Sequence, residues 1–442
     1  MNKGKRGWII AIGLLGWNYL CAQETKPITL QEAIDLSVKN SKQLKNSQAK
    51  IEEATAKLKQ AINNRLPDAK VSASYLRLNS ATVDLKVKSN NNNGGGNVPR
   101  ISQAMYGILN GSLPLYTGGR LQYGIEASKY LAEAAKLDAD NDKDEVIQNT
   151  VEAFVNLYKS KASVELVKED LAESQQRVRD FSNLEQNGLL ARNDLLKAEL
   201  QSSNTELSLL DAENNWQLAN VSMDLLLGLP DTTQLVPDSS LTDQHYTVKA
   251  LDEYVQTAYS NRKDLAAVQQ RKKASETGIK IAKAEYYPSV AVTGGYIAAD
   301  IPKLVTITNA VNLGAGISYN LGSLWKTKAK VQEAEAKTKE LQIGESLMND
   351  NIRLQVSQAY LNWLSSQKKI EVYTKAVEQA TDAYRVIKNK YNNSLATTTD
   401  LLDADVAQLQ ARMNLEFAKA DVVAIYNKLL ETAGLIDQNL NH

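Results

Sequence analysis

The 442-residue sequence has little of the chemistry that enzymes and metal sites use. It holds one cysteine, Cys21, and two histidines, His245 and His442, which we expect to be ordinary exposed residues. Zinc sites need several cysteine or histidine ligands, and a serine-type triad needs a histidine beside a nucleophile. No such spacing occurs, and no glycine-rich loop joins a strand to a helix as a phosphate site requires. The sequence therefore predicts no enzyme, no metal site and no cofactor.

An excess of charge of one sign is also missing. Lysine and arginine number 51, aspartate and glutamate number 51, and the formal net charge is zero. Nucleic-acid-binding proteins carry a basic field that attracts phosphates. The balance therefore predicts no nucleic-acid partner.

Long apolar runs are confined to the N-terminus. Trp8–Leu20 follows a basic start at residues 3–6 and precedes the small residue Ala22, which is the layout of a secretory signal peptide over residues 1–22. The run is short of the roughly 20 apolar residues that a membrane helix needs, and no later segment approaches that length. We expect an exported chain that does not enter a membrane as helices.

Cys21 lies beside the predicted cleavage point, so lipidation of this cysteine is an alternative to its removal. Leu20 is large where lipidation signals take a small residue, which favours removal. The mature protein would then have no thiol chemistry.

Proline is absent from residues 115–229 and from 303 to the end, and both stretches are rich in helix-forming residues. Apolar residues from Ile352 to Tyr391 alternate spacings of four and three, and the run from Val146 to Glu185 repeats this register more weakly. A seven-residue period indicates supercoiled, knobs-into-holes helices. We predict long helices at about 118–186 and 322–391, return helices at about 193–227 and 398–433, and shorter helices near 28–64 and 248–286.

The chain contains an internal duplication. Residues 152–229 align with 358–435 at an offset of 206, while Pro67, Val71 and Tyr75 lie 221 residues before Pro288, Val292 and Tyr296. The extra residues of the first copy fall in the flexible Asn/Gly run at 90–97. We therefore predict a first repeat at 23–229, a linker at 230–247 and a second repeat at 248–442.

Four segments between the short and long helices have a period of two instead. The apolar residues of this alternation are Ala69, Val71, Ala73 and Tyr75; Leu109, Leu113 and Leu115; Val290, Val292 and Tyr296; and Val311, Leu313, Ala315, Ile317 and Tyr319. Apolar residues alternating with small or polar ones are typical of a barrel wall between lipid and water, although a half-buried soluble hairpin would look alike.

Tyrosines accompany these strands. Tyr75, Tyr106, Tyr116, Tyr287, Tyr296 and Tyr319 are expected near strand ends, as in the aromatic girdles of a membrane protein. In hydrocarbon a sheet must close, and membrane barrels start at about eight strands. A chain with four strands must therefore form an oligomer to span a membrane.

The signal sequence, the two copies of helix, strand pair, long helix and return helix, and the Asn/Gly loop together resemble the TolC family of outer-membrane efflux proteins. The resemblance covers nearly all of the mature chain. Its short motifs are Asn187-Gly188-Leu189 with Asp194-Leu195-Leu196, and Tyr391 with Asp400-Leu401-Leu402-Asp403-Ala404.

This resemblance implies a mostly α fold with a small β part. The duplicated coiled-coil hairpins would form an α-barrel across the periplasm, and four strands per chain would contribute to a 12-stranded trimeric barrel in the outer membrane. The family also implies a periplasmic adaptor and an inner-membrane transporter of the RND, ABC or MFS class as partners, in an efflux or type I secretion system. The resemblance also implies that the channel conducts its substrates passively.

The resemblance assigns a periplasmic gate as well. Asp400 and Asp403 match the aspartates that narrow the closed end, and three copies of each would make cation-selective carboxylate rings. Tyr391 and Asp194 match residues that link neighbouring helices, whereas Ala396 stands where the family often has a restraining arginine.

Simpler interpretations remain for these residues and for the whole chain. Thr397 to Asp400 is also a good helix N-cap, Asp403 a favourable first-turn charge, and Tyr391 a closing heptad residue. The alternative function is a periplasmic coiled-coil adaptor or scaffold without a pore, although adaptors typically carry one helical hairpin rather than two.

Overall fold

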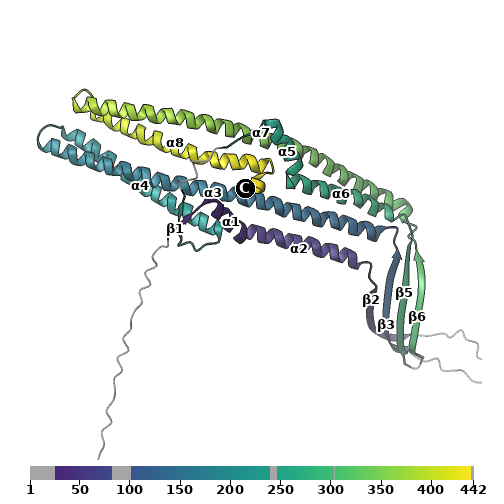
Figure 1. Ribbon diagram of the computed structural model, residues 1–442. Coiled ribbons are helices and arrows are strands. Elements are labelled where there is room, and N and C mark those ends of the chain that lie inside the picture. The colour runs from purple at the N-terminus through teal and green to yellow at the C-terminus, as the bar shows by residue number, and fades with distance from the viewer. Residues whose placement is uncertain (1–24, 82–100, 239–245, 303, 440–442) are drawn as a thin grey trace, which may run out of the picture. The chain divides into compact units, whose positions relative to one another are not determined.

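The computed structural model describes residues 25–81, 101–238, 246–302 and 304–439 (Figure 1). The predicted signal peptide with Cys21, the Asn/Gly loop at 90–97, and both histidines lie outside these residues.

The predicted order of short helices, strand pair, long helix and return helix occurs twice along the chain. The helices are α1 (Leu30–Asn40), α2 (Lys42–Asn63), α3 (Arg120–Gln186), α4 (Arg192–Leu227), α5 (Leu251–Asn261), α6 (Lys263–Ala284), α7 (Ser323–Asn392), α8 (Thr398–Thr432) and α9 (Ile436–Asn439). The strands are β1 (Thr25–Ile28), β2 (Asp68–Ala81), β3 (Ile101–Tyr116), β4 (Gln234–Pro237), β5 (Ser289–Ile301) and β6 (Val305–Ser318).

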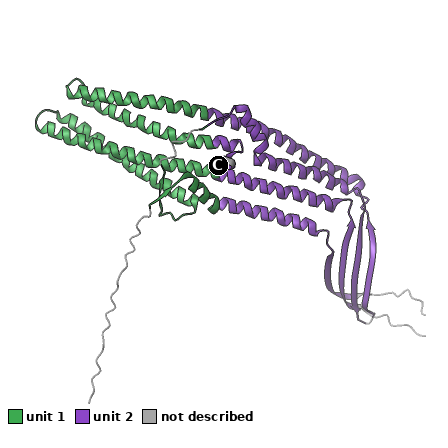
Figure 2. Cartoon of the chain, viewed as in Figure 1, with its two compact units in different colours: residues 1–41, 147–246, 363–427 green, residues 42–146, 247–362, 428–442 purple. Residues whose placement is uncertain are grey.

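The chain divides into two compact units, coloured separately in Figure 2. Unit 1 comprises residues 1–41, 147–246 and 363–427, and unit 2 comprises 42–146, 247–362 and 428–442. Each unit takes segments from both predicted repeats, so the compact units differ from the predicted domains, and those domain boundaries remain a prediction. In unit 1, part of the predicted linker forms β4, which pairs in parallel with β1.

Burial along the long helices follows the heptad. Every heptad position from Ile352 to Tyr391 in α7, and from Val146 to Glu185 in α3, is buried or half-buried. Leu354 and Leu361, which lie off the heptad on α7, stay exposed. The seven-residue period thus marks the packed face, as coiled-coil geometry requires. No helix of the described residues is both long and apolar enough to cross a membrane.

The shorter helices differ from the prediction, which had one continuous helix in each place. The chain leaves the helical region at Ser41 and at Arg262, where ψ is 123° in both cases, so each helix is divided in two. The breaks are 221 residues apart, which is the offset of the duplication in this part of the chain. The continuous-helix prediction was wrong because helix-forming residues flank both breaks and no proline or glycine marks them.

Each break receives the end of a return helix. In unit 1, Asn40 Nδ2 donates to the Leu227 carbonyl at 2.7 Å, and a Cβ on Gly228 would lie 3.0 Å from Asn40 Cβ. In unit 2, a Cβ on Gly434 would lie 3.0 Å from the Asn261 carbonyl carbon. Both glycines have positive φ, 69° and 68°, so a side chain there meets backbone strain as well as a close neighbour.

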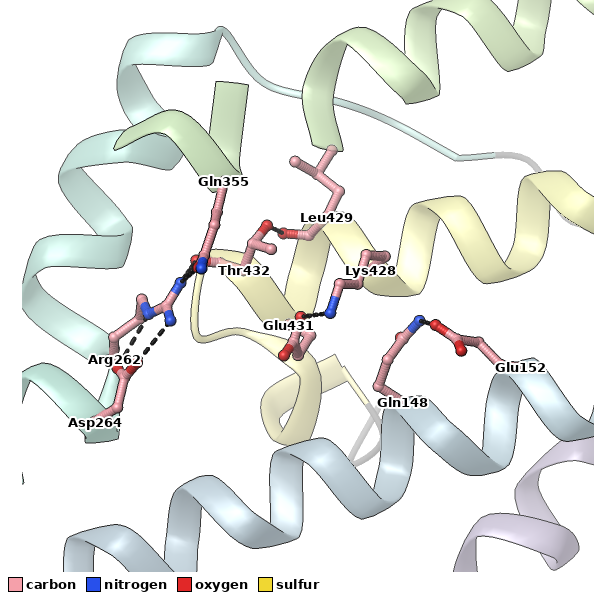
Figure 3. Close-up of polar contacts among 9 residues, drawn as sticks. All are labelled: Gln148, Glu152, Arg262, Asp264, Gln355, Lys428, Leu429, Glu431 and Thr432. Atoms are coloured by element: carbon pink, nitrogen blue, oxygen red, sulfur yellow. Dashed lines mark hydrogen bonds and ion pairs between the residues drawn. The ribbon is translucent and has the colours of Figure 1, made fainter. Parts of the chain in front are cut away.

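Arg262 organises the break in unit 2 (Figure 3). Its guanidinium donates two bonds to Asp264 at 2.6 and 3.0 Å, one to Gln355 Oε1 at 2.8 Å and one to the Thr432 carbonyl at 3.3 Å. The rigid fork of one arginine therefore joins α6, α7 and the C-terminal end of α8.

The four predicted strands form one antiparallel sheet in unit 2, in the order β2-β3-β5-β6. The register places Val71 opposite Leu109, Leu109 opposite Tyr296, and Tyr296 opposite Val311. Because cross-strand partners share a face, the alternating apolar residues lie on one side of the sheet, whereas Ile108 and its partner Ile297 lie on the other. The side with the alternating apolar residues is exposed, with Val311 at 77% and Leu313 at 84%. Within the described residues β2 and β6 each have one unpaired edge.

The tyrosine prediction is only partly right. Tyr116, Tyr287 and Tyr319 lie at the ends of strands where the chain passes to or from a helix. Tyr75, Tyr106 and Tyr296 instead lie well inside their strands, because the strands extend beyond the residues that the alternation marked.

Candidate functional site

The candidate site lies in unit 1, where α3 turns into α4 and α7 turns into α8 (Figure 1). Both turns close in the same way: Leu189 N–H donates to the Leu184 carbonyl at 2.8 Å, and Leu395 N–H donates to the Lys390 carbonyl at 2.8 Å. Gly188 supplies the positive φ of the first turn, 71°, and Ser394 that of the second, 61°. This is the Schellman type of helix end, for which a serine pays a steric penalty that glycine avoids.

Asp400 serves as a helix-capping residue. Its Oδ2 accepts from the Thr397 backbone N–H at 2.8 Å and from the Thr397 hydroxyl at 2.7 Å, while Asp400 N–H donates to Thr397 Oγ1 at 3.1 Å. This reciprocal pattern is a capping box at the first turn of α8. The bond from the Thr397 backbone N–H, followed by that from its hydroxyl, lowers the pKa of Asp400, so the carboxylate is charged at neutral pH.

Asp403 lies one turn further along α8 and is exposed. It has neither a hydrogen bond nor an ion pair with the part of the chain that the structure describes. The spacing of three residues puts Asp400 and Asp403 on one face of the helix, as predicted.

Tyr391 packs between the two hairpins. Its ring stacks on Phe181 of α3, with centroids 5.6 Å apart and planes inclined by 23°. Both residues belong to an apolar cluster with Leu195, Ala198 and Leu401. The Tyr391 hydroxyl makes no hydrogen bond within the described residues, so the structure does not join it to Asp194.

Asp194 takes part in a different link across the turns. Its carboxylate lies 3.7 Å from Lys197 Nζ, and Lys197 donates to Thr399 Oγ1 at 3.1 Å. The first turn of α4 is thereby joined to the first turn of α8.

The sequence did not predict a buried ion pair that lies further along the helices from the turns. Arg177 on α3 donates to Asp405 Oδ2 on α8 at 2.7 Å and to the Tyr384 hydroxyl on α7 at 3.3 Å. The two charged side chains are only 10% and 6% exposed. Ala396 stands in the turn where the family often has an arginine, whereas Arg177 lies on the opposite hairpin, and the second copy has Ala383 at the equivalent position.

A cleft of about 480 Å³ between α3, α7 and α8 contains this pair. Arg412 closes one side by donating two bonds to Glu169, at 2.9 and 3.3 Å. Burial raises the pKa of Asp170 to about 6, the nearby Asp405 charge adds to the rise, and Thr205 and Arg177 oppose it. Asp170 accepts a hydrogen bond from Thr205 of its own hairpin, so its raised pKa makes this wall of the cleft sensitive to pH.

The described residues hold no group of three or more His, Cys, Asp or Glu side chains arranged to bind a metal ion.

The sequence matches a known protein family over most of its length. Residues 33–229 and 254–435 match the family described as "Outer membrane efflux protein". The outer membrane efflux protein BepC of Brucella suis biovar 1 (strain 1330) is 20% identical over 328 residues, which cover 72% of this chain and 70% of BepC.

Solved structures share the fold. The Campylobacter jejuni CmeC outer membrane channel has a TM-score of 0.75 at 18% identity, covering 100% of this chain and 96% of that one. The outer membrane protein VceC of Vibrio cholerae has a TM-score of 0.75 at 19% identity, covering 92% of this chain and 96% of that one. The alternative of a coiled-coil adaptor is thereby set aside. The chain belongs to the outer membrane efflux protein family and is a channel component of the Gram-negative outer membrane rather than an enzyme.

Proposed function

We propose that three copies of this chain form one passive channel that carries substrates from the periplasm to the exterior. The observation that carries the proposal is the sheet of unit 2, which exposes an apolar face and, among the residues that the structure describes, leaves β2 and β6 each with one unpaired edge. In hydrocarbon such edges must be paired, and pairing β6 of one copy with β2 of the next closes the sheet. Three copies of four strands give twelve, an even number within the range of membrane barrels.

Channels of this family work in tripartite systems with a periplasmic adaptor and an inner-membrane transporter. We propose that this chain has an adaptor at its helical turns and a transporter of the RND, ABC or MFS class beyond it. Leu189 and Leu395 support an adaptor contact there, since these large apolar side chains are 74% and 76% exposed at the two turns.

The gate is proposed at the same turns. Three copies of Asp400 and Asp403 would form two rings of carboxylate, which attract cations and exclude anions. Asp400 is held charged by its capping bonds, and Asp403 has no cation beside it within the described residues to neutralise it. Tyr391 would restrain the closed turn by stacking on Phe181, and Asp194 through Lys197 and Thr399.

Conductance across a planar lipid bilayer tests the channel. Mature protein purified in detergent should be trimeric and should give discrete, cation-preferring current steps. If the protein stayed monomeric, did not float together with lipid vesicles and gave no current, the channel would be disproved and the scaffold alternative restored.

The gate is tested with Asp403→Asn, which leaves the capping box intact, and with Asp400→Asn, which retains one capping oxygen. Each should reduce the preference for cations over anions, and both together should reduce it further. Asp211→Asn is the matched control, because Asp211 is an exposed carboxylate further along the first return helix. If the two single variants, the double variant and the control all had the selectivity of the wild-type channel, these carboxylates would not line the pore.

A further inference from the structure

Four strand–helix junctions meet at one end of the sheet in unit 2. The register pairs Asp68 with Ser112, Pro114 with Ala291 and Ser289 with Ser318, so the start of β2, the end of β3, the start of β5 and the end of β6 lie together. At each of these points the chain passes between the sheet and a helix: α2, α3, α6 or α7. We call this end of the sheet the junction belt.

Large apolar side chains are exposed throughout the junction belt. Leu66, Leu115, Tyr287, Leu321, Leu324 and Trp325 each have more than half of their surface exposed. Proteins rarely leave so many large apolar residues together in water, and such patches mark contacts with membranes or partners. Tryptophan and tyrosine in particular gather at the boundary between headgroups and acyl chains.

Basic residues border these apolar side chains. Lys326 and Lys328 on the first turns of α7, and Arg120 at the start of α3, are exposed and form no ion pair within the described residues. Lys328 follows Leu324 by four residues and Trp325 by three, so it shares a helix face with both. The acids at this end are Asp68 and Glu285, and Glu285 is already paired with Lys330 at 2.7 Å.

The order of residues along the chain favours lipid over a second copy. Ile317 on the apolar face is followed by Tyr319, then by Leu321 and Trp325, and then by the lysines, which is the order of chemistry met on leaving a bilayer core. Between Trp325 and Ile343, all of which the structure describes, α7 exposes no large apolar residue. A helix seam between copies would continue its apolar spacing along the helix, because knobs-into-holes packing needs a residue at each turn.

We propose that the junction belt binds the headgroups of anionic phospholipids in the periplasmic leaflet of the outer membrane. Trp325 and Leu324 lie at the level of the glycerol backbone, and Lys326, Lys328 and Arg120 contact the phosphates. The inference rests on the proposed channel, since it requires the sheet to lie in the membrane.

Quenching of Trp325 fluorescence by brominated lipid tests the proposal. The mature protein carries Trp216→Phe and Trp363→Phe, two positions whose indole nitrogens are buried without a hydrogen bond, so that Trp325 alone reports. It is reconstituted in phosphatidylcholine vesicles that contain brominated phosphatidylglycerol or brominated phosphatidylcholine. Phosphatidylglycerol should quench preferentially, and Lys326→Gln with Lys328→Gln should reduce its relative affinity at least about fivefold, as expected for the loss of lysines near an anionic surface.

Lys337→Gln with Lys339→Gln is the matched control, because these exposed lysines lie on the same helix beyond the apolar turn. The control should retain the preference for phosphatidylglycerol. Conductance measured on the same vesicles separates the two proposals, since a conducting channel upholds the proposed function whatever the quenching. No quenching by either lipid in a conducting channel would place Trp325 against protein and overturn the lipid proposal. Equal quenching by both lipids, unchanged by the lysine substitutions, would overturn the anionic preference.

Discussion

At the scale of single residues, the buried ion pair of Arg177 and Asp405 joins the two hairpins, and loss of one partner should cost more than loss of both. Arg177→Met should destabilise the protein by about 3–5 kcal/mol, because Asp405 would remain buried without a partner. Adding Asp405→Leu should recover most of that loss, since two apolar residues can replace a buried pair at little cost. Thermal unfolding in detergent, followed by helical circular dichroism, measures both variants. If the double variant were as unstable as Arg177→Met, the loss would not come from an unpaired Asp405. The carboxylate of the single variant would then be in contact with water.

Asp224 on α4 is a second buried charge, and one that lacks compensation. Its side chain is 0% exposed, and neither carboxylate oxygen has a hydrogen-bond partner within the described residues. Burial raises the pKa of Asp224 to about 6, and Asp231 adds to the rise. The equivalent residue of the second copy is Leu430, so the duplication itself supplies an apolar replacement.

The sign of the resulting pH dependence follows from this raised pKa. The folded protein holds the proton more tightly than the unfolded chain, so the stability is full below the unfolded value of 3.8 and falls as the pH rises through about 6. Asp224→Leu should remove this fall and stabilise the protein at pH 7 by about 3 kcal/mol. Unfolding midpoints at pH 4 and pH 7 measure the effect. The prediction would be contradicted if the difference in stability between Asp224→Leu and the wild-type protein were the same at pH 7 as at pH 4.

The sequence predicted which residues gather at the turns better than it predicted their partners. The capping role of Thr397 and Asp400 is local, spanning three residues, and was available from the pattern. The stacking of Tyr391 on Phe181 and the pairing of Arg177 with Asp405 join segments about 200 residues apart. Such pairs depend on how one hairpin is rotated against the other, which no local period specifies.

At the scale of elements, the docking of α8 on the break between α5 and α6 can be measured by substituting one glycine. Gly434→Ala should cost about 1–2 kcal/mol for the positive φ, and more for a Cβ only 3.0 Å from the Asn261 backbone. Gly188→Ala is the matched control, because Gly188 has φ of 71° but nothing within 4 Å of an added Cβ. The difference between the two unfolding free energies isolates the contact. Equal losses would show that the break and the helix end are not tightly packed.

The long elements were predictable because their signals are periodic and local. The heptads, which end at Glu185 and Tyr391, together with the proline-free stretches, placed the ends of α3 and α7 within two residues of those observed. The breaks at Ser41 and Arg262 were not predictable in the same way, since Arg262 is fixed by contacts with Gln355 and Thr432, which are remote in sequence. The strands were found in part: alternation marked their central residues, but not how far each continued.

At the scale of the whole molecule, the duplication gives one chain two strand pairs that meet in a single sheet. β3 of the first repeat pairs with β5 of the second repeat, so the sheet of a single chain already joins one repeat to the other. The sheet therefore ends in β2 on one side and β6 on the other. In the proposed trimer, the same antiparallel rule would pair β6 of one chain with β2 of the next and so close the sheet.

The two faces of the sheet allow a direct test of this assembly. Leu313 on β6 is 84% exposed on the apolar face, and its neighbour Gly314 points to the opposite face, where an added Cβ meets nothing within 4 Å. Leu313→Arg should cost about 2–4 kcal/mol per copy if the apolar face meets lipid, and should reduce the amount of membrane-inserted oligomer. Gly314→Arg places the same charge one residue away on the water-filled side, so it should insert normally and lower the cation preference of the current. Vesicle flotation measures insertion and bilayer reversal potentials measure selectivity. If both arginines inserted equally well, the apolar face would not be in contact with lipid, and the sheet would have to be covered by protein instead.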